Sequence, residues 1–345
     1  MRPHVMLHAN NFFWQGGVPM FIHDLISIYP EFHHVIVYMH DEARFGGENF
    51  EMMDEWQNEF GCEIAKVDLI TPQLLKEVDP AVVMLNSIRG DKLEGTYPYD
   101  WLQAWPVIFF HHAATKPLVP VDVDVFISKY VMSKYQGMEQ RFRNPMVCPP
   151  AIDVGSYSKI KRDPNSTRCV VGKVCSAWNK NKYPAKLYNV MRKLGEKYPD
   201  VEFIVVGGGR HNTLQQLQVP RLKFITEMSM PVPQMLEQID IFLYINEENF
   251  PETWCRAVSE AMASGIPVVV DNFAGTAEQV EDGIGGFACG TEDEFVEKLS
   301  LLIEDKRTRH EIGMQARDKA VDRYSLERLR RDTVPHVMRA LTGVV

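Results

Sequence analysis

Two glutamates, Glu252 and Glu260, stand eight residues apart in a segment with the pattern of a loop, a helix, a turn and a strand. Small residues follow Glu260, and then come Gly265, Pro267 and a run of valines. If the residues between the glutamates are mostly helical, the two carboxylates lie about 12 Å apart along the helix axis. That separation suits an extended ligand held at both ends, because paired carboxylates acting across one glycosidic bond must lie closer together.

The start of this helix could bind an anion. Its first backbone N–H groups, near Trp254 and Cys255, have no partner within the helix and form the positive end of its dipole. A diphosphate between the two carboxylates would use both features. Taken alone, however, two glutamates at this spacing are also common on solvated helix faces.

Glycines and lysines elsewhere in the chain could complete a phosphate site. Gly16 and Gly17 precede a helical pattern, and their backbone could approach a phosphate closely because glycine has no Cβ. Lys173 and Lys182 could neutralise a diphosphate as point charges, although each could equally be a solvated loop residue. His111 and His112 are polar residues at the end of a strand pattern, and taken alone either could simply end the strand.

These residues need a parallel sheet to bring them together. Short apolar runs alternate with longer amphipathic stretches, which is typical of repeated βα units. In the first half the predicted strands are 5–8, 35–39, 81–85, 107–110 and 125–127, and in the second half they are 169–174, 202–206, 222–225, 241–245, 267–270 and 286–288. The fold class is therefore α/β, with two successive doubly wound domains.

The chain has 345 residues, enough for two domains at about 150 residues each. The charged, turn-forming segment Lys161–Ser166 reads as a linker. We therefore predict one Rossmann-like domain over residues 1–163 and another over 164–324, with a cleft between them. Residues 325–345 contain apolar residues at helical spacing, and this final helix is expected to pack back on the N-terminal domain.

The segment after Glu252 resembles the E-x7-E signature of retaining GT-B glycosyltransferases of family 4, the glycosyl transferases group 1. It matches at both glutamates, at Ala261-Met-Ala263, and at Gly265, Pro267 and the valines, whereas Cys255 replaces the usual Gly. The resemblance continues in order along nearly the whole chain, at Gly16-Gly17, Ile108–His112, Val125–Ser128, Pro150–Asp153, Gly172-Lys173 with Lys182, Val205–Gly209, Gly275–Glu278 and Asp282-Gly283.

This resemblance implies a GT-B fold and a role for each matching residue. Glu252 would accept hydrogen bonds from the donor sugar, and Glu260 would accept them from the ribose. Lys173 and Lys182 would bind the diphosphate, and His111 or His112 would face the sugar. The remaining nucleotide-sugar contacts would come from Gly16, Gly17, Gly207, Gly209, Trp254 and Cys255.

The implied activity is retaining transfer of a hexose from a UDP- or GDP-linked sugar to a sugar, glycan or lipid-linked acceptor. No cofactor and no metal are expected: Asp122-Val-Asp124 has the Asp-x-Asp form of a metal-nucleotide site in another transferase fold, but its position just before a strand suggests coincidence. Retention comes from the resemblance and not from the spacing of the residues.

Three alternatives stay open. A related GT-B enzyme, such as a nucleotide-sugar epimerase or a phosphorylase, would share these motifs, and so would a non-catalytic sugar-nucleotide-binding protein. An oxidoreductase is suggested by Gly207-Gly-Gly209 after a strand with Glu227 beyond it, but Asn212 stands where the third glycine of a dinucleotide fingerprint is needed.

Composition limits the partners and the location. The net charge of −9 argues against a surface that binds nucleic acid. The six cysteines form no CxxC pair, and neither a signal sequence nor a membrane span is evident, so a cytoplasmic protein is expected. A candidate basic cluster, Arg141, Arg143, Lys159, Lys161 and Arg162, leaves peripheral contact with a membrane open. The oligomeric state cannot be predicted.

Overall fold

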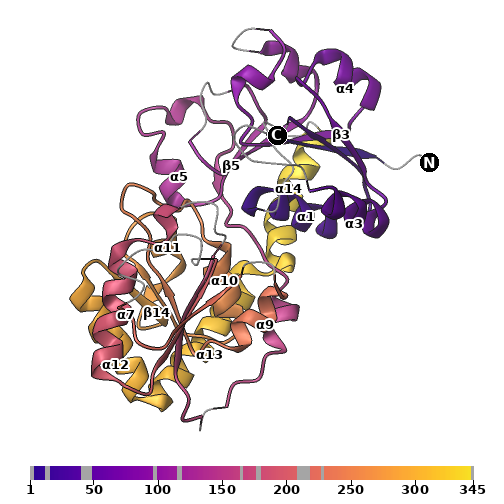
Figure 1. Ribbon diagram of the computed structural model, residues 1–345. Coiled ribbons are helices and arrows are strands. Elements are labelled where there is room, and N and C mark those ends of the chain that lie inside the picture. Colours follow the sequence, from indigo (N-terminus) through magenta and orange to yellow (C-terminus); the bar gives the residue numbers. More distant parts are fainter. Residues whose placement is uncertain are drawn as a thin grey trace. The chain divides into compact units, whose positions relative to one another are not determined.

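A computed structural model describes residues 4–11, 16–39, 49–95, 99–114, 119–163, 166–175, 180–207, 218–226 and 229–342. The chain forms two compact units (Figure 1), unit 1 from Met1–Ala151 with Leu326–Val345, and unit 2 from Ile152–Ser325. Each unit contains one seven-stranded sheet in which neighbouring strands run parallel. The predicted α/β class with two doubly wound sheets is confirmed.

Unit 1 has the strand order β3-β2-β1-β4-β5-β6-β7. Its strands are β1 (Val5–Asn10), β2 (His33–Tyr38), β3 (Glu63–Lys66), β4 (Val82–Asn86), β5 (Val107–His111), β6 (Val123–Phe126) and β7 (Met146–Val147). Its α-helices are α1 (Gly17–Ile28), α3 (Phe50–Phe60), α4 (Pro72–Val78), α5 (Lys129–Ser133) and α14 (Leu326–Thr342). The helix α14 packs on α1, β4 and β5.

Both faces of this sheet are covered, which explains why its central strands are apolar at nearly every position. Leu7 and Val83 belong to one core cluster, whereas their neighbours Met6 and Met84 belong to another that includes residues of α1 and α14. Successive side chains of a strand point to opposite faces, so each central strand contributes to two cores.

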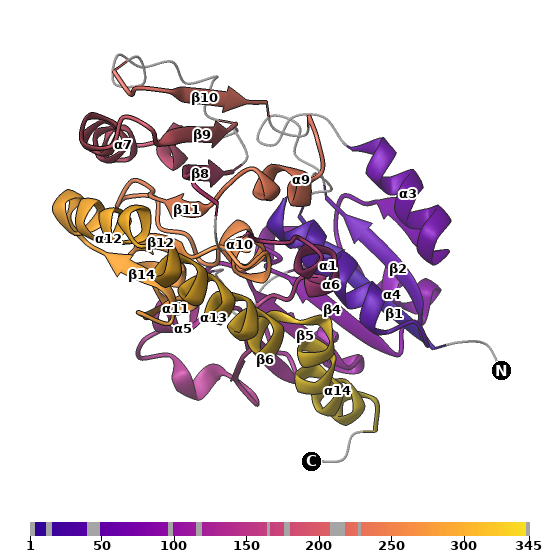
Figure 2. The same ribbon diagram turned by 90° about the horizontal axis from the view of Figure 1, so that it is seen from below.

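Unit 2 has the order β10-β9-β8-β11-β12-β14-β13. Its strands are β8 (Val170–Val174), β9 (Glu202–Val206), β10 (Leu222–Ile225), β11 (Ile241–Tyr244), β12 (Val268–Asp271), β13 (Glu281–Asp282) and β14 (Gly285–Cys289). Its α-helices are α6 (Val154–Ser158), α7 (Ala185–Lys197), α9 (Val232–Glu237), α10 (Arg256–Ala263), α11 (Ala274–Gln279), α12 (Glu292–Glu304) and α13 (Lys306–Tyr324). The helices α7 and α12 pack together, and so do α10 and α13 (Figure 2).

The strand order of each sheet reverses near its centre. In unit 1 the chain leaves β1 toward β2 on one side and returns to β4 on the other, and in unit 2 the same happens at β8 and β11. Open α/β sheets bind ligands outside the carboxyl ends of the strands at such a switch point. The loops that follow β1, β4, β8 and β11 are therefore the places to look for a site.

Two features differ from the sequence prediction. The division between the units falls after Ala151, earlier than the predicted boundary after residue 163, because α6 packs on α10 and α13 and Arg162 donates to three carbonyl oxygens of unit 2. The peripheral strands β3, β7 and β13 were not predicted. In the part of the chain that the structure describes, no helix combines the length and apolar character needed to cross a bilayer.

Candidate active site at the switch point of unit 2

Glu252 and Lys182 form an ion pair beside the carboxyl ends of β8 and β11. The Lys182 Nζ lies 2.9 Å from the Glu252 Oε1, and the two side chains are only 12% and 15% exposed. The Tyr244 hydroxyl donates to the same carboxylate oxygen at 2.9 Å. Burial disfavours the Lys182 ammonium, but Cys175 and Glu252 nearby outweigh it and raise its pKa above the ordinary value. Lys182 is therefore charged at neutral pH.

Main-chain contacts bring these two side chains together. Lys182 ends a short 3-10 turn, Lys180–Lys182, between β8 and α7. The Glu247 N–H, in the loop after β11, donates to the Asn181 carbonyl of that turn at 2.9 Å. The two loops are thus bonded to each other through their backbones, and the ion pair spans them.

The helix α11 fixes the backbone of Glu252 from the other side. The Gly275 N–H donates to the Glu252 carbonyl at 2.8 Å. A Cβ at position 275 would lie only 1.9 Å from the Thr253 carbonyl oxygen, so this close approach requires glycine. The sequence match at Gly275 thus has a structural reason.

The helix between the two glutamates is shorter than assumed. The helix α10 begins at Arg256, so the segment from Glu252 to Cys255 is a loop, and the separation of about 12 Å expected for a continuous helix does not apply to it. Glu260 lies within α10, is 7% exposed, and accepts from the Arg256 Nε at 3.1 Å. Both glutamates are therefore held by a basic side chain.

Cys255 is the N-cap of α10, and its backbone N–H and carbonyl both form hydrogen bonds within the protein. Its N–H donates to the Gln279 Oε1 at 3.1 Å, and its carbonyl accepts from the Gln279 Nε2 at 2.9 Å. This corrects the expectation that the Cys255 N–H is available to an anion. Burial raises the pKa of the Cys255 thiol to about 12, so the thiol stays protonated. Trp254, beside it, stacks edge-on against Tyr324 at 5.3 Å.

Lys173 lies in β8 and is completely buried. Its ammonium donates to the Ile245 carbonyl at 2.5 Å and to the Asn246 Oδ1 at 3.2 Å. Burial lowers its pKa to about 8. The Lys173 ammonium is thus bonded inside the core, and its contact with a diphosphate stays a prediction.

The glycine motif after β9 is described only in part. Gly207 has a φ of +83°, which glycine adopts readily, and its N–H donates to the Ile225 carbonyl at 2.9 Å. Gly209, Asn212 and Glu227 lie outside the described residues. Among the residues that are described, no three His, Cys, Asp or Glu side chains gather as a metal site would require.

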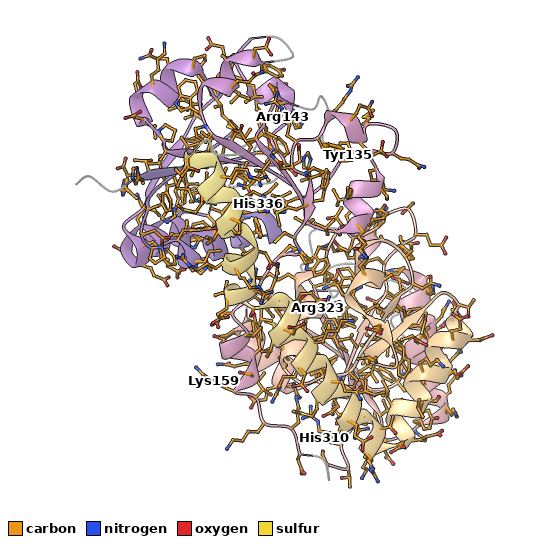
Figure 3. The ribbon with its side chains drawn as sticks, turned by 180° about the vertical axis from the view of Figure 1, so that it is seen from behind. Tyr135, Arg143, Lys159, His310, Arg323 and His336 are labelled. Carbon is orange, nitrogen blue, oxygen red and sulfur yellow. The ribbon has the colours of Figure 1, made fainter. Side chains whose placement is uncertain are left out.

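In unit 1 the two neighbouring histidines have different surroundings. The His111 Nε2 lies 2.8 Å from the Asp124 Oδ1, and its Nδ1 lies 3.1 Å from the hydroxyl of Tyr135. Tyr135 is labelled in Figure 3. The His112 Nε2 donates to the Asn86 Oδ1 at 3.2 Å, and its ring contacts Phe21 of α1 edge-on at 4.9 Å. Burial lowers the pKa of His112 to about 3, so its ring is neutral.

Gly16 and Gly17 lie where the switch point of unit 1 predicts a ligand. Gly16 is the N-cap of α1 and makes no side-chain cap, and Gly17 is the first helical residue. A Cβ at Gly17 would meet no atom within 4 Å, so packing does not require glycine there. Asn11, after β1, donates to the Ser87 carbonyl after β4 at 2.7 Å and so links the two loops.

Sequence reasoning missed Tyr244 and Gln279. Tyr244 ends the apolar run Ile241–Tyr244 and reads as one more core residue, although its hydroxyl is the part that contacts Glu252. Gln279 is fully buried in a short helix and could have been noticed only as a polar residue next to the Gly275–Glu278 motif. Neither the end of an apolar run nor a polar residue beside a motif indicates which residue the side chain contacts.

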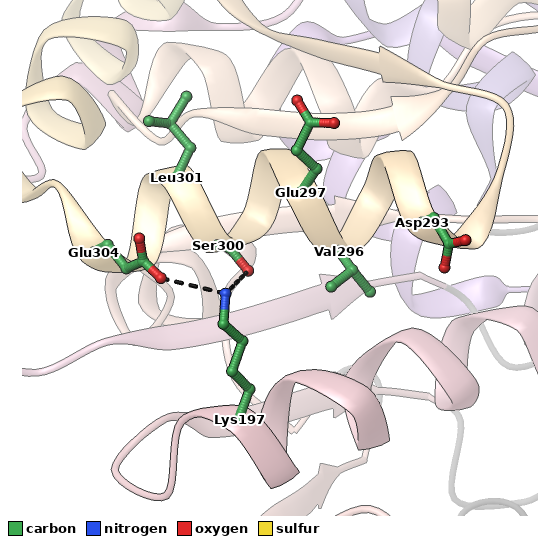
Figure 4. A pocket seen from close by; sticks show the side chains of 7 residues that line it. All are labelled: Lys197, Asp293, Val296, Glu297, Ser300, Leu301 and Glu304. Carbon is green, nitrogen blue, oxygen red and sulfur yellow. Dashed lines mark hydrogen bonds and ion pairs between the residues drawn. The ribbon is translucent and has the colours of Figure 1, made fainter.

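Two surface features do not join this site. A groove between α7 and α12 (Figure 4) is lined by Lys197, Asp293, Val296, Glu297, Ser300, Leu301 and Glu304, whereas Glu252 and Lys182 come from loops after β11 and β8. Of the proposed basic cluster, Arg143 belongs to unit 1 and Lys159 to unit 2 (Figure 3). Arg162 is tied to main-chain carbonyls instead of facing a membrane.

Comparison with known proteins agrees with this geometry. A family model described as Glycosyl transferases group 1 matches residues 168–319, which contain Lys182, Glu252 and Glu260. The spore coat protein SA of Bacillus subtilis is 20% identical over 91% of this chain and 92% of its own length.

Solved structures share the fold over the whole chain. A glycosyltransferase from Rickettsia africae matches with a TM-score of 0.77 and 13% identity, covering 100% of both chains. Anabaena HepE, solved in complex with UDP-glucose, matches with a TM-score of 0.72 and 16% identity over 99% of this chain and 100% of that one. The chain therefore has the GT-B fold, and its residues 168–319 match the family of glycosyl transferases group 1.

Proposed function

We propose that this chain is a retaining, metal-independent glycosyltransferase that moves a hexose from a UDP- or GDP-linked donor to a sugar or lipid-linked acceptor. The observation that supports it best is the Lys182–Glu252 pair at the switch point of unit 2, followed at once by α10 with Glu260. Unit 2 would bind the donor, and unit 1 would bind the acceptor.

The two members of the pair have different tasks. Glu252 would accept hydrogen bonds from hydroxyls of the donor sugar, since a carboxylate only accepts. Lys182 would contact the diphosphate, where its charge opposes the negative charge that develops as the sugar–phosphate bond breaks. Glu260, held by Arg256, would accept hydrogen bonds from the ribose hydroxyls. Lys173 would support this site from inside the core.

Retention requires no strong base of the protein. The bond between the anomeric carbon and the phosphate oxygen breaks, a bond to the acceptor oxygen forms on the same face, and the acceptor proton passes to the departing phosphate oxygen. Preorganised charge and orientation then supply the catalysis.

Of the two histidines, His112 is the better partner for a sugar. Both ring nitrogens of His111 contact side chains of the protein, whereas among the described residues His112 is bonded through its Nε2 alone, to Asn86. Because its ring is neutral, His112 would act as a hydrogen-bonding group and not as an acid.

A donor screen tests this function. Thermal stability is measured with UDP- and GDP-linked hexoses, and release of free nucleotide is then followed with and without acceptor sugars and in the presence of EDTA. We expect stabilisation by one nucleotide series, slow hydrolysis without acceptor, no loss in EDTA, and a product whose anomeric configuration by NMR equals that of the donor.

Other outcomes would identify the alternatives. Binding without any nucleotide release would indicate a sugar-nucleotide-binding protein. Release only on addition of inorganic phosphate would indicate a phosphorylase, and conversion of the donor to another UDP-sugar would indicate an epimerase. An inverted product would contradict the proposed stereochemistry.

A further inference from the structure

We infer that Tyr244 is a positioning residue for Glu252, whose carboxylate it orients toward the donor sugar. This inference rests on the proposed function and deepens it. Tyr244 and Lys182 both contact the Glu252 Oε1, each at 2.9 Å. Two donors on one oxygen fix the plane of the carboxylate, and its second oxygen, Oε2, is then directed at the sugar hydroxyls.

Tyr244 is well suited to anchor a loop residue. Glu252 lies in a loop with no regular secondary structure, whereas Tyr244 is the last residue of the central strand β11 and is 1% exposed. Its ring therefore cannot change rotamer without disturbing the core. Burial raises the pKa of the Tyr244 hydroxyl well above its ordinary value, so the hydroxyl keeps its proton and donates it to the carboxylate.

The buried Lys173 packs against the ring of Tyr244 and is bonded to the residues that follow it. Its Nζ lies 4.2 Å from the centroid of the Tyr244 ring and bonds to the next two residues, Ile245 and Asn246. A cation over the ring withdraws electron density from the phenol and strengthens its O–H as a donor. The Cys175 Sγ lies 3.5 Å from the same hydroxyl, and the Cys255 thiol also contacts it. Lys173 would thus act on Glu252 through Tyr244 and not on the diphosphate.

The test is the Tyr244→Phe variant, which removes only the hydroxyl. We expect the rate of donor hydrolysis, as kcat/KM, to fall by more than about tenfold, because a hydrogen bond to a charged group is lost. The affinity for the free nucleotide, UDP or GDP, should stay within about twofold, since Glu252 is assigned to the sugar. A merely structural role would lower both.

A matched control is Tyr183→Phe. Its hydroxyl is also buried and lies within hydrogen-bond distance of the Cys175 and Val206 carbonyls, at 3.0 and 3.1 Å, and its ring lies 5.5 Å from the Lys173 Nζ. This variant should lose stability but keep donor hydrolysis within about threefold. A second comparison places Tyr244→Phe in the Glu252→Gln background, where it should have little further effect, because the two residues act as a unit.

Two results would overturn this assignment. One is a Tyr244→Phe enzyme with wild-type kcat/KM while Glu252→Gln is impaired, and the other is full additivity of the two substitutions. Either would leave the proposed function intact. A wild-type protein that hydrolyses no nucleotide sugar would refute the function and, with it, the role of Tyr244.

Discussion

At the residue scale, the proposed chemistry depends on a cation, Lys182, whose charge is already balanced by Glu252. Lys182 faces Glu252 at 2.9 Å in a site that is mostly shielded from water. A buried ion pair is costly to break by removing one member, because the other charge is then left without a partner. Under the proposed function, Lys182 would gain further anionic partners from the diphosphate without leaving Glu252. The charges of the pair would therefore stay compensated with and without the donor.

Lys182→Ala should lower kcat for donor hydrolysis by more than about tenfold, or about 1.4 kcal/mol of transition-state stabilisation. The control is Lys180→Ala, an exposed lysine at the start of the same turn, which should change kcat by less than about threefold. Steady-state kinetics with the donor identified by the screen checks both. If Lys180→Ala is the more damaging change, the phosphate role belongs to Lys180.

Glu260→Ala should weaken nucleotide binding by about tenfold, since the ribose would lose its acceptor and Arg256 would lose its partner. Isothermal titration with UDP or GDP measures this. Glu252→Gln should leave the same affinity within about twofold. Equal losses in both variants would contradict the assignment of one glutamate to the nucleoside and the other to the sugar.

Residue identities gave the types of the site side chains but not their directions. Lys173 and Lys182 look equally suited to a diphosphate in the sequence. In the structure Lys173 points into the core because it lies within a central strand, whereas Lys182 follows that strand in a loop. The hydrogen-bond partner of Cys255 could not be predicted either, because Gln279 belongs to a helix that follows the next strand.

At the element scale, α11 holds the glutamate loop at the cost of strained backbone. Ala274, its first residue, has a φ of +58°, a conformation that is unfavourable for any residue with a Cβ. The next residue, Gly275, must approach the Thr253 carbonyl closely. The strain at Ala274 thus lies directly beside the contact that positions Glu252.

Ala274→Gly should raise the free energy of unfolding by about 0.5–1 kcal/mol, because relief of the positive φ exceeds the extra entropy of glycine in the unfolded chain. Denaturant unfolding followed by circular dichroism checks it. In the same helix, Ala277→Gly should lower stability by a similar amount, since no such strain exists there to relieve. A destabilised Ala274→Gly protein would show that the alanine side chain packs more strongly than its backbone is strained.

Elements with a buried, apolar pattern were the predictable ones. Central strands such as β4 and β11 are continuous apolar runs, and their bounds agree with the pattern to within about two residues, as expected for such boundaries. The edge strand β3 reads Glu-Ile-Ala-Lys and is mostly exposed, so no apolar run marks it. Its existence follows from pairing with β2, which is a tertiary event.

At the scale of the whole molecule, the two units bury different titratable groups. In unit 1, burial lowers the pKa values of His8, His34 and His112. His8 and His34 form a buried pair, with 3.0 Å between the His8 Nε2 and the His34 Nδ1. In unit 2, burial raises the pKa of Asp271 to about 6. The units should therefore respond to acid in opposite directions.

Acidification from pH 7.5 to 5 should destabilise unit 1 more than unit 2. A histidine whose pKa is lowered in the folded chain does not reduce the free energy of unfolding at a pH above its pKa in the unfolded chain, which is about 6.5. Below that pH, the histidine binds a proton in the unfolded chain but not in the folded chain. Stability then falls by about 1.4 kcal/mol per pH unit for each such histidine, down to its folded pKa. Asp271 acts in the opposite sense, because below pH 6 its folded form binds the extra proton.

Hydrogen exchange read by mass spectrometry distinguishes the two units, since peptides of each report its own opening. Peptides from β1 and β2 should lose protection at pH 5, after correction for the intrinsic exchange rate, while those from β11 and β12 keep it. The variant His8→Gln retains a donor toward His34 but cannot be protonated, so the pH dependence of unit 1 should become shallower by about 1.4 kcal/mol per pH unit. An unchanged slope would mean that His8 is not among the groups that make unit 1 sensitive to acid.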